Sequence, residues 1–88
     1  MMKYTATRAH GIIGSSNGKP ALAEIKIDGN YLTKENVGKD VMLRNGKSIL
    51  DVKWPFIHNL VVTKNIEQHE IEIIPKTDNF VFYTFVFG

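Results

Sequence analysis

The sequence predicts an all-β domain, a small barrel or sandwich of about six to seven short antiparallel strands with at most one short helical turn. Apolar and polar residues alternate in short runs, and the spacing of apolar residues expected of an amphipathic helix is almost absent. Asp28-Gly29 and Asn45-Gly46 separate neighbouring runs, and both pairs favour tight turns between antiparallel strands. Together these patterns favour sheet over helix throughout the chain.

The first third of the chain predicts two strands joined by a surface loop. The first strand covers MKYTATRA, residues 2–9, where Thr and Tyr suit a half-buried sheet surface. Three glycines, two serines and a proline in residues 11–20 predict a surface loop. In ALAEIKI, Ala23, Ile25 and Ile27 alternate with polar residues and predict a strand with one buried face.

The middle of the chain predicts a short turn and a hairpin. Thr33 is placed to cap a single helical turn that ends at Gly38. The runs VMLR and KSILDVKW flank Asn45-Gly46, which predicts a two-residue hairpin loop. This register sets Arg44 opposite Lys47, and like charges in that position repel each other unless solvent or an anion screens them.

The last third predicts three more strands. Pro55 indicates a bulge, an edge or a corner, and FIHNLVVT and HEIEIIP follow it as two separate strands. The final run, FVFYTFVFG, is apolar at both alternating positions, so both of its faces need cover. We expect either a closed monomeric barrel or a homo-oligomer formed through residues 80–87.

Composition narrows the class of protein. A chain of 88 residues predicts one domain, residues 1–88, and the absence of cysteine excludes disulfides and thiolate catalysis. We see no secretory signal and no apolar run long enough to span a bilayer, so we expect a cytoplasmic protein without a membrane partner. The charge balance is +4 over residues 1–53 and −2 over residues 54–88, which favours anion binding by the first part.

No catalytic or metal motif is present. Gly18-Lys19 resembles the end of a phosphate-binding P-loop, but the first glycine of that pattern falls on Ile13 and Pro20 replaces the magnesium-binding hydroxyl residue. A zinc site would need three histidines to converge from distant elements. We therefore predict a protein that is not an enzyme and carries no cofactor.

Two groups of residues are candidate ligand contacts. The basic group and its turn asparagine would bind phosphate, with residues 14–18 as a cover, and the aromatic group after the hairpin would stack on a ring. Each group also has a structural interpretation, as exposed charges at a hairpin tip or as aromatic core. The candidates are Arg8, Lys19, Arg44, Asn45 and Lys47 for the anion, and Trp54, Phe56 and His58 for the ring.

The stretch LRNGKSILDVKWPFIHNLVV, residues 43–62, resembles small SH3-like β domains of phage accessory proteins. It shares their succession of a strand, an Arg-Asn-Gly-Lys turn, a second strand and a proline-led apolar strand. The resemblance implies a small, non-catalytic protein that sequesters a host factor or a nucleotide signal.

Three functions remain open from sequence. The leading hypothesis is a binding protein that captures an anionic small molecule such as a nucleotide, in the manner of a phage counter-defence protein. The second is an inhibitor or adaptor that docks a partner protein through an exposed strand or apolar face. The third is a barrel-type module that binds nucleic acid, which the low net charge of +2 opposes.

Overall fold

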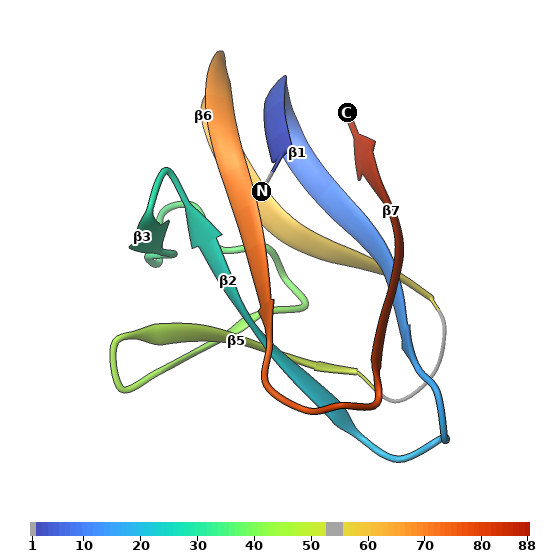
Figure 1. Cartoon of the computed structure of the whole chain (residues 1–88). Coiled ribbons are helices and arrows are strands. Elements are labelled where there is room, and N and C mark those ends of the chain that lie inside the picture. The colour runs from blue at the N-terminus through green and yellow to red at the C-terminus, as the bar shows by residue number, and fades with distance from the viewer. Residues whose placement is uncertain (1, 53–55) are drawn as a thin grey trace.

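The computed structural model describes residues 2–52 and 56–88, and these form seven antiparallel strands in one sheet (Figure 1). The order across the sheet is β4-β5-β2-β6-β1-β7, with β3 paired to β2, and the sheet does not close into a barrel. The all-β prediction is confirmed. The strands are β1 (Met2–Ser15), β2 (Ala21–Ile27), β3 (Asn30–Tyr31), β4 (Met42–Arg44), β5 (Lys47–Val52), β6 (Phe56–Pro75) and β7 (Phe80–Phe87).

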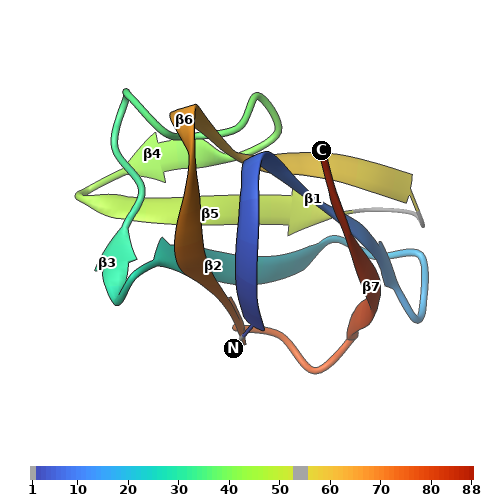
Figure 2. The same cartoon turned by 90° about the horizontal axis from the view of Figure 1, so that it is seen from above.

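Two long bent strands, β1 and β6, fold the sheet over its own core (Figures 1 and 2). They pair along two stretches, residues 2–6 with 67–71 and residues 8–13 with 56–62. Between these stretches, residues 63–66 of β6 lie across from Thr7 alone, and Ile66 at this corner is 73% exposed. Extra residues in one strand of a pair bend it strongly, so both strands turn here and pass from one layer to the other.

The core lies between the two layers and draws mainly on β1, β2, β5 and β6. In β2, Ala23, Ile25 and Ile27 are buried as their alternation predicts. The buried apolar cluster consists of Tyr4, Ala6, Ala9, Ile13, Ile25, Ile27, Leu32, Val41, Leu50, Val52, Leu60, Val61 and Ile71.

Both predicted hairpin turns are confirmed. Asp28 and Gly29 have positive φ angles of 51° and 82°, and Asn45 and Gly46 have φ angles of 52° and 76°. Positive φ at both central residues is the geometry that matches the twist of two-residue hairpins. Arg44 lies opposite Lys47, as the turn chemistry predicts.

The predicted loop over residues 11–20 is wrong in its first half. β1 continues to Ser15 as a central strand between β6 and β7, and only residues 16–20 form a loop. Gly11 lies within this strand, and a Cβ there would approach the Ile13 Cδ1 atom to 2.7 Å and the Leu60 Cδ1 atom to 3.1 Å. Glycine marks close packing at this position, although the same residue in a sequence suggests a turn.

One further strand assignment changes. FIHNLVVT and HEIEIIP belong to the single strand β6, because the intervening residues bend without breaking it. The predicted helical turn is a hydrogen-bonded turn in which the Val37 amide donates to the Thr33 carbonyl at 3.0 Å.

The described residues contain no helix, and hence none that could cross a membrane. Pro55 and Trp54 lie outside the described residues.

The last strand is apolar at both alternating positions because it contains a bulge, whereas the sequence prediction invoked cover on both of its faces. Ile12 pairs with Thr84 and Ile13 with Phe82, so Tyr83 has no opposite residue and forms a bulge in β7. The bulge reverses the alternation and turns the phenylalanines on both sides of it toward the same inner face. Phe80, Phe82 and Phe85 line one groove with residues of β6, and Phe87 stacks on Tyr4 at 4.8 Å between ring centroids.

Candidate functional site

An open groove of about 660 Å³ lies on the strand pair β1 and β6, beside the segment that leads into β4. The antiparallel register places His10 opposite Asn59 and Arg8 opposite Val62, and both residues of β1 line the groove. The groove is lined by Arg8, His10, Lys39, Asp40, Phe56, Ile57, Asn59 and Val62.

Gly38 positions one wall of the groove. Its amide donates to the Leu60 carbonyl at 2.8 Å, and Val37 forms a bridge with Val61, so this segment runs along the edge of β6. A Cβ at residue 38 would lie 2.3 Å from the carbonyl oxygen of Asn59. Only glycine permits this approach, which carries Lys39 to the groove.

The Thr33 turn fixes where this segment begins. The Thr33 hydroxyl accepts a hydrogen bond from the Glu35 amide at 3.3 Å, and the Asn36 side-chain oxygen accepts one from the Thr33 amide at 2.7 Å. The Val62 amide then donates to the Asn36 carbonyl at 2.9 Å. This local capping chemistry aligns the turn with β6.

The charges in the groove favour an anion. Arg8 and Lys39 are exposed cations, and neither takes part in an ion pair within residues 2–52 and 56–88. Asp40 is the acidic residue of the lining, and one of its oxygens accepts a hydrogen bond from the Asn59 amide at 2.6 Å. That bond commits Asp40 to the backbone, while the side-chain oxygen of Asn59 is buried and has no hydrogen-bond partner among the described residues.

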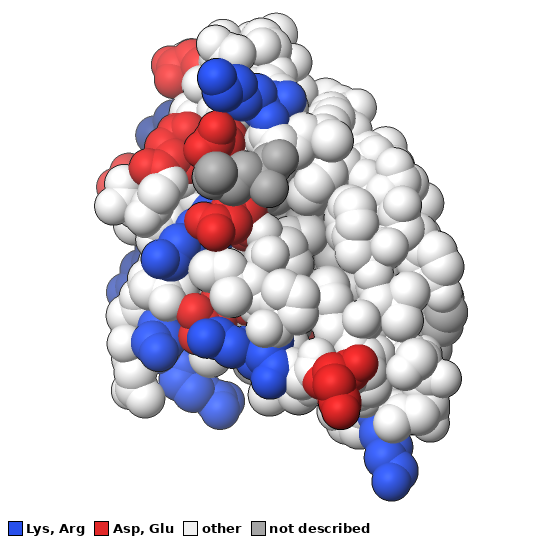
Figure 3. All heavy atoms as spheres, viewed as in Figure 1, with Lys and Arg blue, Asp and Glu red and all other residues white. Residues whose placement is uncertain are grey.

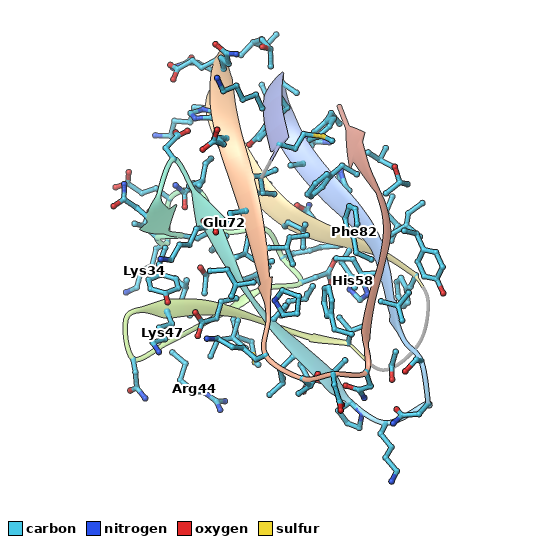
Figure 4. All side chains as sticks on the ribbon, in the orientation of Figure 1. Lys34, Arg44, Lys47, His58, Glu72 and Phe82 are labelled. Carbon is cyan, nitrogen blue, oxygen red and sulfur yellow. The ribbon has the colours of Figure 1, made fainter. Side chains whose placement is uncertain are left out.

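Phe56 supplies the aromatic surface of the groove and is 46% exposed. Its ring stacks on the imidazole of His58, with 5.0 Å between centroids and 25° between planes. His58 itself is 8% exposed and lies on the inner side of the sheet (Figure 4). Burial lowers the pKa of His58, while the Asp40 charge and a hydrogen bond with the Ile13 backbone act in the opposite direction. Phe56 and His58 lie two residues apart on β6, so their stacked rings lie on the same side of the strand, and His58 packs against the Phe56 ring.

The hairpin cations lie elsewhere. Figure 4 places Arg44 and Lys47 together at the lower left, near Lys34 and far from His58. The Lys47 ammonium lies 3.7 Å from the carboxylate of Glu24, which relieves the repulsion expected between Lys47 and Arg44. Asn45 occupies the turn itself.

Glu24 is the centre of a polar cluster on the outer face of β2. The Tyr31 hydroxyl donates to it at 2.6 Å, and the Lys76 ammonium lies 3.6 Å away. The Tyr31 hydrogen bond, followed by the charges of Lys76 and Lys47, lowers the pKa of the Glu24 carboxyl, against the effect of burial. A paired carboxylate at this place offsets the basic charge and makes the hairpin a poor anion site.

The loop of residues 16–20 is held by its own hydrogen bonds. The side-chain amide of Asn79, which is buried, donates to the Lys19 carbonyl at 3.1 Å and to the Asn17 side-chain oxygen at 3.0 Å. The Lys19 amide donates to that same Asn17 oxygen at 3.1 Å. The Ser16 and Lys19 amides, two of the donors that a phosphate would need, are thus already bonded.

The three histidines occupy separate environments. His69 Nδ1 lies 2.7 Å from the Asp28 carboxylate, whose other oxygen accepts the Glu70 amide at 2.8 Å. The His69 bond and then the Glu70 bond lower the pKa of Asp28. No group of three or more potential metal-binding side chains occurs in the part of the chain that the structure describes.

The structure thus brings together two of the eight candidate residues, Arg8 and Phe56, with six that were not candidates, among them His10, Lys39 and Asn59. Trp54 lies outside the described residues. The alternation of Arg8 and His10 was the available signal, but the predicted strand ended at residue 9 and left His10 outside it. No family model, curated protein or solved structure matches this chain.

Proposed function

We propose that the protein is a non-catalytic binding protein that captures an anionic molecule with a flat ring, such as a nucleotide, in the groove of β1 and β6. The observation that carries this proposal is that Arg8 and Lys39, which have no ion-pair partner among the described residues, line the same groove as the half-exposed Phe56. The combination offers a phosphate and an aromatic base their two preferred kinds of contact.

Each lining residue has a distinct role in this proposal. The Arg8 guanidinium binds two phosphate oxygens through its planar pair of donors, and the Lys39 ammonium adds a point charge. The Phe56 ring stacks on the base, a contact that contributes about 1–3 kcal/mol per base in single-stranded nucleic-acid binding. Asn59 lies opposite His10 and offers its side-chain NH2 group as a donor to the ring edge, since its side-chain oxygen is buried.

The size of the groove suits a small molecule. Its volume of about 660 Å³ falls within the usual range of small-ligand sites, about 300–1,000 Å³. The lining also mixes apolar side chains, Ile57 and Val62, with the polar groups, as such sites commonly do.

Isothermal titration calorimetry with adenosine monophosphate, adenosine and inorganic phosphate tests the proposal. We expect the monophosphate to bind more tightly than either part alone. Arg8→Gln should weaken its binding about tenfold, the loss of one charge-assisted contact of about 1.4 kcal/mol. Arg44→Gln is the matched control, since it removes the same charge from the hairpin and should leave binding unchanged. Equal effects of the two variants would reject the groove as the phosphate site.

The other functions predicted from sequence give different results in the same assay. A nucleic-acid module would bind a single-stranded oligonucleotide with steep salt dependence and the monophosphate weakly. An inhibitor or adaptor would bind none of these probes. The resemblance to phage SH3-like domains supports a sequestering role. We propose that the protein fills this role by capturing a nucleotide signal in the cytoplasm.

A further inference from the structure

The last strand, β7, ends the sheet and exposes an uncharged edge. It pairs with β1 on one side and has no strand partner on the other among residues 2–52 and 56–88. Residues 80–88 contain no charged residue and no proline. Figure 3 shows the surface over β1 and β7 as largely free of charge, with the acidic and basic side chains gathered over the opposite half. Edge strands usually carry a charge or a proline that prevents pairing with another chain, and β7 has neither.

The hydrogen bonds of β7 establish which backbone groups face outward. Arg8 and Gly88 exchange two backbone hydrogen bonds, at 3.0 and 3.2 Å. In antiparallel pairs such exchanges alternate with pairs whose groups point away from each other. Phe87 and Phe85 therefore direct their N–H and C=O groups to the free edge.

The same alternation continues beyond the bulge. The Ser16 amide donates to the Asn79 carbonyl at 2.9 Å, so the next position, Phe80, faces outward, and so does Phe82. The free edge thus presents the backbone groups of Phe80, Phe82, Phe85 and Phe87, with the bulge in the middle.

This set of four is symmetric about the bulge. If a second β7 runs antiparallel with Phe80 opposite Phe87, then Phe82 falls opposite Phe85 and every outward-facing residue has an outward-facing partner. Tyr83 and Thr84 then lie at the two-fold axis. A two-fold interface requires one surface to complement itself, and the bulge gives β7 that property.

We propose that two copies of the chain pair through their β7 edges in this register and form one continuous antiparallel sheet. Four hydrogen-bonded residue pairs form, and each exchanges two bonds. The phenylalanine side chains of both copies lie on the inner face, where those of one copy already line a groove of about 320 Å³ with Ile71, Ile73 and Pro75. Aromatic pairs across strands stabilise such contacts further. The dimer does not depend on the proposed ligand.

Charge substitution at Thr84 tests the pairing, since this exposed residue would meet its own copy near the axis. We expect the unaltered protein to be a dimer by light scattering after size-exclusion chromatography at micromolar concentrations. Thr84→Lys and Thr84→Glu should each be monomers, because like charges then face each other, and an equimolar mixture should restore a dimer. Circular dichroism checks that each variant is folded. Gln68→Lys, which adds the same charge as Thr84→Lys on an exposed part of β6, should remain a dimer.

The mixing step separates pairing from misfolding, since two misfolded variants do not regain association when combined. A monomeric unaltered protein at all concentrations would overturn the proposal. So would a dimer that persists in both Thr84 variants, because the contact would then lie on another surface.

Discussion

Ser48 offers the sharpest test of how the layers are joined. Its side chain is fully buried, and its hydroxyl accepts a hydrogen bond from the Leu32 amide at 3.0 Å and donates one to the Ile25 carbonyl. The β2–β5 ladder ends at Glu24 and Ile49, one position before this bridge. The Ser48 hydroxyl therefore takes the place of the backbone hydrogen bonds of this ladder at the point where β2 diverges from β5 toward β3.

Ser48→Ala removes the hydroxyl and leaves two buried backbone groups without a partner. Each such group costs about 1–3 kcal/mol, so we expect the free energy of unfolding to fall by at least about 2 kcal/mol. For a domain of this size, that loss lowers the melting temperature by about 8–16 °C.

Thermal unfolding followed by circular dichroism measures the effect. Ser16→Ala is the matched control, because Ser16 is exposed in the loop of residues 16–20 and contributes a backbone hydrogen bond only. A melting temperature for Ser48→Ala within about 2 °C of the unaltered protein would refute the role assigned to the hydroxyl.

Two further outcomes are expected. Gly38→Ala forces a Cβ against the Asn59 carbonyl and should cost about 1–3 kcal/mol in denaturant unfolding, whereas Gly88→Ala enters open space and should cost nothing measurable. His58 has a lowered pKa in the folded state, so the folded protein disfavours its protonation. Its contribution to stability should be constant above its unfolded pKa of about 6.5 and should decline as the pH falls from there toward the lower folded value. A pH dependence of unfolding between pH 7.5 and 5.5 that is unchanged in His58→Gln would contradict this assignment.

Local chemistry made part of the fold predictable. The turns at Asp28-Gly29 and Asn45-Gly46 need positive φ at both central residues, and those residue types favour it irrespective of the rest of the chain. The buried face of β2 was equally clear, because Ala23, Ile25 and Ile27 alternate without interruption.

Features that depend on distant contacts were not predictable. Gly11 looks like a loop residue in the sequence but lies, closely packed by side chains, inside a central strand. The alternation in the last strand changes at Tyr83, and only the register with β1 reveals the bulge there. A single sequence carries no information on such long-range register.

The groove was partly predictable, because some of its residues could be chosen from their side-chain chemistry alone. Arg8 and Phe56 were chosen for their chemistry, and the fold brings them to one surface. Lys39 reaches that surface only because Gly38 packs against β6, a contact between segments about twenty residues apart. Lys47 was chosen by the same chemistry, but Glu24 from another strand pairs with it.

The measurement that tests the proposed function most directly is a titration of the ¹⁵N-labelled protein with adenosine monophosphate, followed by two-dimensional NMR. The proposal predicts that the amide signals that shift belong to the groove, above all those of Arg8, His10, Lys39 and Asn59. Adenosine alone should move the signals near Phe56 and leave that of Lys39 in place. Shifts confined to Arg44, Asn45 and Lys47, or no shifts at millimolar nucleotide, would contradict it.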